Sequence, residues 1–142
     1  SEGAHDTEIR GGLTSYHPKK YSEKTKTDFM FDMKGKKILL LSAHKLPDMF
    51  KEFQEKTHLA LTDVDYIIPH QASRALSLVM DKLGIAEDQY LNIVTDYGNM
   101  VSVSVPFGLS YSLDPGLVNE GDVVYILGTA AGMTVQMLAL KL

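Results

Sequence analysis

The sequence has 142 residues, of which 44% are apolar and 23% charged, and this length and composition fit one ordinary globular domain. The net charge of −4 disfavours a nucleic-acid binder, which normally carries a basic face. Because cysteine is absent, the chain supplies no disulfide, no thiolate metal ligand and no thiol nucleophile.

The first part of the chain predicts no regular structure and no targeting signal. Residues 1–33 are polar and weakly periodic, and we interpret them as an irregular lead-in segment, with a short strand possible at 29–33. They lack the apolar stretch of a signal peptide, and no apolar run in the sequence reaches the length of a membrane span. We therefore expect a cytoplasmic protein without a membrane span.

A second region, residues 34–142, shows strong alternation of helical and strand patterns. Apolar residues at helical spacing predict a helix over 36–57, in which Pro47 predicts a kink or a break into two helices. The remaining expected elements are strands at 66–68, 90–94, 123–128 and 133–142, helices at 73–83 and 103–113, and turns at 96–99 and 129–132. This pattern predicts an α/β domain that closes with a hairpin.

A histidine follows the first of these strands directly. His70 lies in the sequence Pro-His-Gln-Ala, between strand 66–68 and a helix, where an imidazole could polarise a carbonyl, move a proton or bind a metal. A purely structural role, as a capping or packing residue, is the alternative. The sequence contains no His-x-His or His-x-x-x-His pair, so we expect no metal site.

Two further turns carry residues suited to a reaction site. Asn99, in Tyr-Gly-Asn-Met, has an amide that could donate to a developing oxyanion, or it could be an ordinary turn residue. The small residues at 128–132 would let backbone N–H groups approach a ligand, or would simply form a tight hairpin. The latter segment lacks the glycine pattern of a dinucleotide site, and we expect no cofactor.

In this order, the three segments resemble β-ketoacyl-[acyl-carrier-protein] synthase III. The resemblance is carried by Ile-Ile-Pro-His-Gln-Ala at 67–72, by Tyr-Gly-Asn at 97–99 with Ser-Val-Ser-Val-Pro at 102–106, and by the small-residue hairpin. It covers residues 34–142, and residues 1–33 match no named pattern. The resemblance implies one half of a thiolase-like fold, a mixed sheet with helices packed on it, as the C-terminal domain of a condensing enzyme.

The resemblance also implies a reaction and its partners. Enzymes of this family join an acyl thioester to a malonyl thioester, with decarboxylation, on a cysteine that the N-terminal half supplies. His70 and Asn99 would be the catalytic residues that hold the enolate oxygen. A second oxyanion hole would be formed by the backbone N–H of that cysteine together with the backbone of the hairpin at Ala131 and Gly132. The implied partners are that N-terminal half, acyl carrier protein or coenzyme A thioesters, and a second copy in a homodimer.

Three departures from the family pattern qualify these assignments. The hairpin is poorer in glycine than usual, Ser73 stands where asparagine is common, and the arginine that docks the carrier protein often lies one position after Arg74. Although it is displaced by one position, Arg74 is the candidate that the resemblance offers for carrier docking. The segment 97–100 also resembles chalcone-synthase-like polyketide synthases, and hydroxymethylglutaryl-CoA synthases are a weaker match.

A second hypothesis belongs to another functional class. Some condensing systems pair an active subunit with a relative that lacks the nucleophile and contributes structure or control of chain length. Since the chain has no cysteine, it could be such a catalytically silent partner. The coding sequence directly upstream discriminates the two, because an in-frame half with a cysteine at a strand-to-helix turn favours the enzyme.

Overall fold

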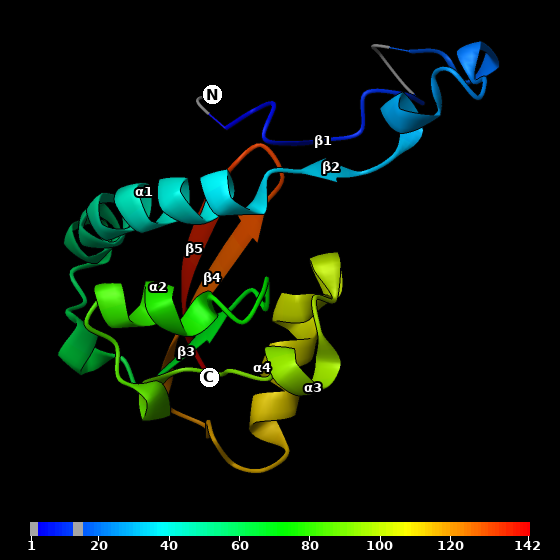
Figure 1. Cartoon of the computed structure of the whole chain (residues 1–142). Helices are drawn as coiled ribbons and strands as arrows, with labels where there is room; N and C mark the ends of the chain where they lie inside the picture. The colour runs from blue at the N-terminus through cyan, green and yellow to red at the C-terminus, as the bar shows by residue number, and fades with distance from the viewer. Residues whose placement is uncertain (1–2, 13–15) are drawn as a thin grey trace. The chain divides into compact units, whose positions relative to one another are not determined.

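The computed structural model describes residues 3–12 and 16–142 and consists of two compact units. One unit contains the described residues up to 41 together with 130–134, and the other contains residues 42–129 and 135–142. The helices are α1 (Gly35–Thr57), α2 (Leu76–Lys82), α3 (Val94–Tyr97) and α4 (Ser104–Leu113), and the strands are β1 (Thr7–Glu8), β2 (Asp32–Met33), β3 (Tyr66–Pro69), β4 (Val123–Ala130) and β5 (Thr134–Lys141) (Figure 1). Short 3₁₀ turns lie at Pro18–Lys20, Lys26–Phe29, Leu61–Asp63, Glu87–Gln89 and Val101–Val103.

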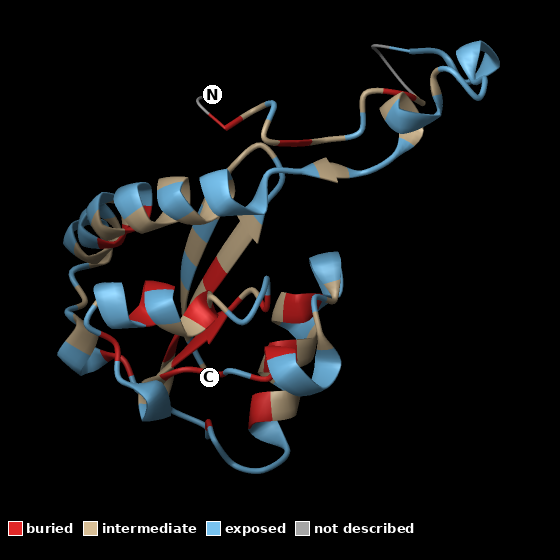
Figure 2. Ribbon diagram, in the orientation of Figure 1, coloured by how far each residue is buried: buried red, intermediate tan, exposed pale blue. Residues whose placement is uncertain are grey.

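A mixed sheet in the order β3-β4-β5 organises the larger unit. β3 pairs with β4 in parallel, with Ile67 opposite Tyr125, and Ile67 also forms a parallel bridge to Tyr90. β3 thus has neighbours along both edges, and its residues Ile67 and Ile68 are buried, as expected of a parallel strand covered on both faces (Figure 2). The predicted α/β class is confirmed.

The core of this unit is formed by apolar residues from β3, β4, the helices and the connecting segments. One cluster of buried core residues consists of Ile68, Leu91, Ile93, Val118 and Val124. Helix α4 packs against β3 through a face of small residues, because Ser104, Gly108 and Ser112 recur every four residues and are all buried. A Cβ at Gly108 would lie 3.0 Å from both Ile68 Cγ2 and Leu91 Cδ2, so glycine permits the close approach of helix and strand.

Helix α1 contains Pro47 without being divided there. Of the two outcomes expected from the sequence, the break into two helices is therefore wrong. Proline removes one backbone hydrogen bond, but most helical stability in proteins comes from packing. Leu46 and Phe50 are buried on either side of the proline, and the Phe50 ring lies edge-on to Tyr125 with centroids 5.9 Å apart.

The predicted strand at 90–94 is wrong beyond its first residue. Tyr90 makes a single bridge to β3, and α3 begins at Val94. The apolar pattern is real, but its residues Leu91 and Ile93 are buried in the core and do not form a strand of the sheet. The turn expected at 129–132 is also displaced, since β4 continues to Ala130 and the turn occupies 131–133, with φ of 73° at Gly132 and 54° at Met133.

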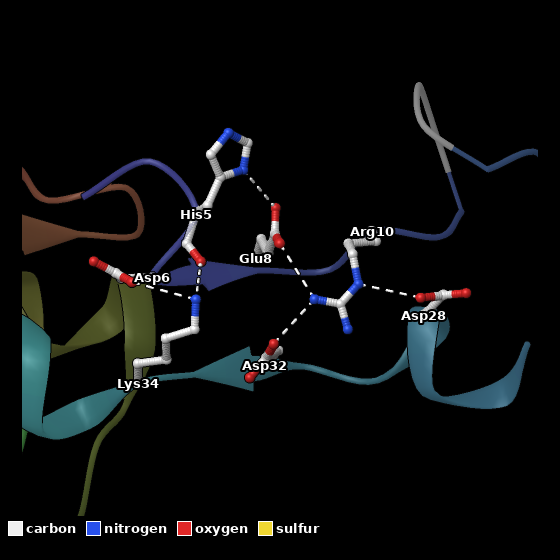
Figure 3. A network of polar contacts seen from close by, with 7 residues as sticks. All are labelled: His5, Asp6, Glu8, Arg10, Asp28, Asp32 and Lys34. Carbon is white, nitrogen blue, oxygen red and sulfur yellow. Dashed lines mark hydrogen bonds and ion pairs between the residues drawn. The ribbon is translucent and has the colours of Figure 1, made fainter. Parts of the chain in front are cut away.

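The smaller unit is held by a polar network on a two-stranded antiparallel sheet (Figure 3). Arg10 donates hydrogen bonds to Glu8 (3.3 Å), Asp28 (3.1 Å) and Asp32 (3.0 Å), and the carboxylates, Asp32 foremost, raise its pKa further. In the same network Lys34 donates to the carbonyl of His5 at 3.0 Å. The short strand expected at 29–33 is formed in part, by β2 at Asp32–Met33, whereas the weak periodicity of the lead-in segment did not predict the ion pairs of Arg10.

Candidate active site

His70 directly follows β3 and continues its pairing with β4. Its backbone N–H donates to the carbonyl of Leu127 at 2.7 Å, which fixes the main chain of the residue. The imidazole is half-buried, and this burial lowers its pKa from the ordinary value of 6.5. Within the part of the chain that the structure describes, the ring has no hydrogen-bond partner. At neutral pH it is therefore a neutral imidazole with a free N–H donor.

We expect the lowered pKa of His70 to appear in its proton titration. Because the folded state disfavours the imidazolium, the folded protein binds this proton less readily than the unfolded chain does. The resulting stability is complete above pH 6.5 and is lost as the pH falls from 6.5 through the lowered pKa. NMR titration of the His70 ring should give a midpoint below 6.5, and a midpoint at or above that value would contradict the burial argument.

Asn99 lies on the segment that contacts the loop after His70. Its side-chain Nδ2 donates to the carbonyl of Ala72 at 3.2 Å, and its Oδ1 accepts from the backbone N–H of Val101 at 2.8 Å. These two bonds fix the orientation of the amide. The bond to Ala72 uses one of the two amide hydrogens, and an asparagine side chain has two to donate.

The backbone on both sides of Asn99 has an unusual conformation, and at Val101 it is strained. Gly98 has φ 66° and ψ −165°, a conformation that is essentially restricted to glycine. Val101 has a φ of 53°, which is a true outlier for a β-branched residue. Strain of this kind persists where the surrounding structure imposes it, and it concentrates at functional sites. Here the strained residue is Val101, whose backbone N–H donates the hydrogen bond that holds the Asn99 amide.

Gln71, to which the sequence reading gave no role, joins the two segments from inside the core. The side chain is fully buried, and its Nε2 donates to the carbonyls of Pro69 (3.0 Å) and Leu91 (2.9 Å). Its Oε1 accepts from the N–H of Ile93 at 2.9 Å. In the sequence this position is marked only by an uncharged polar residue next to an apolar strand, and that signal is too weak to show that the fold buries it.

The other candidates lie in exposed turns. Arg74 is exposed in the turn that precedes α2, and its carbonyl accepts from Ser77 Oγ at 3.4 Å. Ala131 and Gly132 lie in the turn between β4 and β5, within the smaller unit. Among residues 3–12 and 16–142, no cluster of three or more histidine, aspartate or glutamate side chains could hold a metal ion. No helix in these same ranges is long and apolar enough to cross a membrane.

Comparison with known families gives a match to the 3-oxoacyl-[acyl-carrier-protein] synthase III C-terminal family over residues 54–142. The β-ketoacyl-[acyl-carrier-protein] synthase III of Oceanobacillus iheyensis is 31% identical over 110 residues, which cover 77% of this chain and 35% of that protein. The synthase III of Clostridium beijerinckii is 29% identical over 124 residues, which cover 87% of this chain and 38% of that protein. The chain thus spans little more than a third of the length of these relatives.

Solved structures give the same fold. A 3-oxoacyl-(acyl-carrier-protein) synthase III with 20% identity superposes with a TM-score of 0.91 over 99% of this chain and 44% of that one. The synthase III of Thermus thermophilus has 25% identity and a TM-score of 0.82 over 99% of this chain and 43% of that one. A histidine-to-alanine variant of Xanthomonas campestris OleA, at 21% identity, has a TM-score of 0.73 over 79% of this chain and 33% of that one. The thiolase-like fold expected from the sequence is confirmed.

Proposed function

Because this chain belongs to the 3-oxoacyl-[acyl-carrier-protein] synthase III C-terminal family, we propose that it is the His- and Asn-bearing domain of a condensing acyltransferase. The reaction is the decarboxylative Claisen condensation of an acyl thioester with a malonyl thioester. The 142 residues contain no cysteine, so the thiol that carries the acyl group comes from an N-terminal half, either in the same longer chain or in a second chain.

The proposed roles of His70 and Asn99 follow from the charge that develops during decarboxylation. When the bond to the carboxylate breaks, its electron pair moves into the malonyl unit and negative charge appears on the thioester oxygen. Donors that are already oriented stabilise this oxygen better than water does. His70 offers the N–H of a neutral imidazole, and Asn99 offers an amide held by Ala72 and Val101.

The second half of the proposed reaction forms the new carbon–carbon bond. The enolate carbon attacks the acyl thioester, a tetrahedral oxyanion forms, and the cysteine leaves as a thiolate. We assign this second oxyanion to the backbone N–H of the cysteine together with the backbone of the hairpin at Ala131 and Gly132. Arg74, which is exposed, is the candidate contact for an acyl carrier protein, and coenzyme A thioesters are the alternative donors.

One observation carries this proposal. The Asn99 amide is bonded to Ala72, only two residues after His70, although 27 positions separate Asn99 from Ala72 in the sequence. The fold thus brings the second polar motif onto the loop that bears the first. An asparagine serving only as a turn residue would need no such bond across the domain.

The proposal is tested by the condensing activity of the chain with and without a thiol-bearing half. The purified chain alone should form no 3-oxoacyl product from an acyl and a malonyl thioester, because no thiol accepts the acyl group. Mixed with the cysteine-bearing half of the Oceanobacillus iheyensis synthase, it should form that product. A malonyl-coenzyme A analogue with a methylene in place of the thioester sulfur should shift the NMR signals of His70 and Asn99.

Two results would overturn the proposal. Product formation by the chain alone, at the rate of the mixture, would require another nucleophile. If no mixture forms product and the analogue leaves both side chains unshifted, the site does not bind a malonyl thioester. The catalytically silent partner would then be the better interpretation.

A further inference from the structure

Gln71 has the hydrogen-bonding pattern of a residue that positions others. A glutamine amide has two N–H donors and one carbonyl oxygen, and here each donor is used once and the oxygen accepts. All three partners are backbone groups. A fully buried amide with every donor satisfied is rigid, because breaking any one bond leaves a buried polar group without a partner.

The backbone groups that Gln71 binds belong to two separate segments. The carbonyl of Pro69 lies at the end of β3, directly before His70. The carbonyl of Leu91 and the N–H of Ile93 lie on the segment that leads into α3. The Leu91 N–H in turn donates to Ile67 at 2.9 Å, so the second segment is held against β3 by main-chain and side-chain bonds together.

The link continues from Ile93 to Asn99 through α3. The carbonyl of Ile93 accepts from Asp96 (3.1 Å) and Tyr97 (3.0 Å), which makes Ile93 the residue that starts the helix. A single helical turn then leads to Gly98 and Asn99. At the far end, Asn99 donates back to Ala72. The loop after His70 is thus tied to the segment 91–99 twice, by Gln71 where α3 begins and by Asn99 after α3 ends.

We propose that Gln71 is a positioning residue that sets the relative placement of the His70 and Asn99 side chains. It contacts neither side chain and acts only through the backbone on which each is mounted. The inference rests on the roles proposed above for those two residues. It adds that their geometry depends on a buried amide that takes no part in the chemistry.

The test replaces Gln71 by methionine, which has similar length but no hydrogen-bonding amide. In Gln71→Met, the Ile93 N–H loses its acceptor, and its hydrogen exchange should accelerate by about tenfold or more. The NMR signals of the His70 ring and the Asn99 side-chain amide should both shift. Ser112→Ala is the matched control, because Ser112 is equally buried and loses one bond, to the carbonyl of Gly108.

The control separates positioning from general stability. Both variants should melt at a lower temperature, but Ser112→Ala should leave the signals of His70 and Asn99 in place. If Gln71→Met moves those signals no further than Ser112→Ala does, Gln71 is only a structural residue and the proposal is wrong. These measurements need no substrate, so they are independent of whether the malonyl analogue binds.

A second variant covers the case in which Gln71→Met does not fold. Gln71→Glu keeps the size and one acceptor for Ile93 but, when ionised, presents a carboxylate to two carbonyl oxygens. Protonation restores one donor. The His70 and Asn99 signals of Gln71→Glu should therefore move toward the wild-type positions as the buried carboxylate is protonated, and signals that stay displaced would overturn the proposal.

Discussion

Replacing His70 by alanine is expected to lower the rate of malonyl-thioester decarboxylation by about 10²- to 10³-fold, the usual effect of removing one oriented oxyanion donor. The assay is the release of carbon dioxide by this chain paired with a cysteine-bearing half. The loss should appear in kcat more than in KM, because the N–H of His70 meets full negative charge only as the enolate forms.

His44→Ala is the matched control for this experiment. His44 lies exposed on α1, and its replacement by alanine removes an imidazole while preserving a good helix former. The control should retain the activity of the unchanged chain. A loss of less than threefold in His70→Ala would show that the imidazole does not stabilise the enolate, and equal losses in both variants would point to a general effect of removing a histidine.

The sequence predicted the candidate residues because each polar motif follows an apolar segment. A strand of the Ile-Ile-Pro type delivers the next residue to the end of a sheet, and that is where His70 lies. The order of the motifs carried the family resemblance, which the match over 54–142 confirms. The roles of His70, Asn99, Arg74, Ala131 and Gly132 remain predictions.

The sequence could not predict which backbone groups each side chain would satisfy. The segment 90–94 has the apolar pattern of a strand, but only Tyr90 and Leu91 are bonded to β3, through Ile67. From Leu91 onward the other hydrogen bonds of the segment go to the Gln71 side chain and into α3. A periodicity argument detects burial and not the partner that accompanies it. The same limit hid the role of Gln71, since a single polar residue beside a strand gives no pattern.

The left-handed backbone at Val101 illustrates a second limit. Propensity disfavours positive φ at valine, and only the surrounding contacts impose it. The N–H of Val101 bonds to Asn99, and Val101 begins the 3₁₀ turn that leads directly into α4. We infer that the conformation is imposed by the bond to Asn99 and by the turn into α4, neither of which can be read from the preference of valine itself.

Gly108→Val is expected to destabilise the domain by about 1–3 kcal/mol, the usual cost of adding volume to a packed interior. Even the first added carbon would lie 3.0 Å from Ile68 Cγ2 and Leu91 Cδ2. Both neighbours are buried, Ile68 at 0% and Leu91 at 2% exposure, so a shift of either side chain disturbs the packing of the core. Gly108→Ala should lose less, since alanine is better than glycine in a helix by about 1 kcal/mol.

Ser110→Val is the control, because it places the same side chain on the exposed face of α4. Urea unfolding followed by circular dichroism should show a change within about 0.5 kcal/mol for this variant. If Gly108→Val is as stable as Ser110→Val, α4 does not pack on β3 at this point.

If Gly108→Val is destabilised, the site should respond as well, because Leu91 presents its side chain to Gly108 and its carbonyl to Gln71. Pressure on Leu91 from α4 would then displace the segment that ends at Asn99, and the side-chain amide signal of Asn99 should shift in Gly108→Val but not in Ser110→Val.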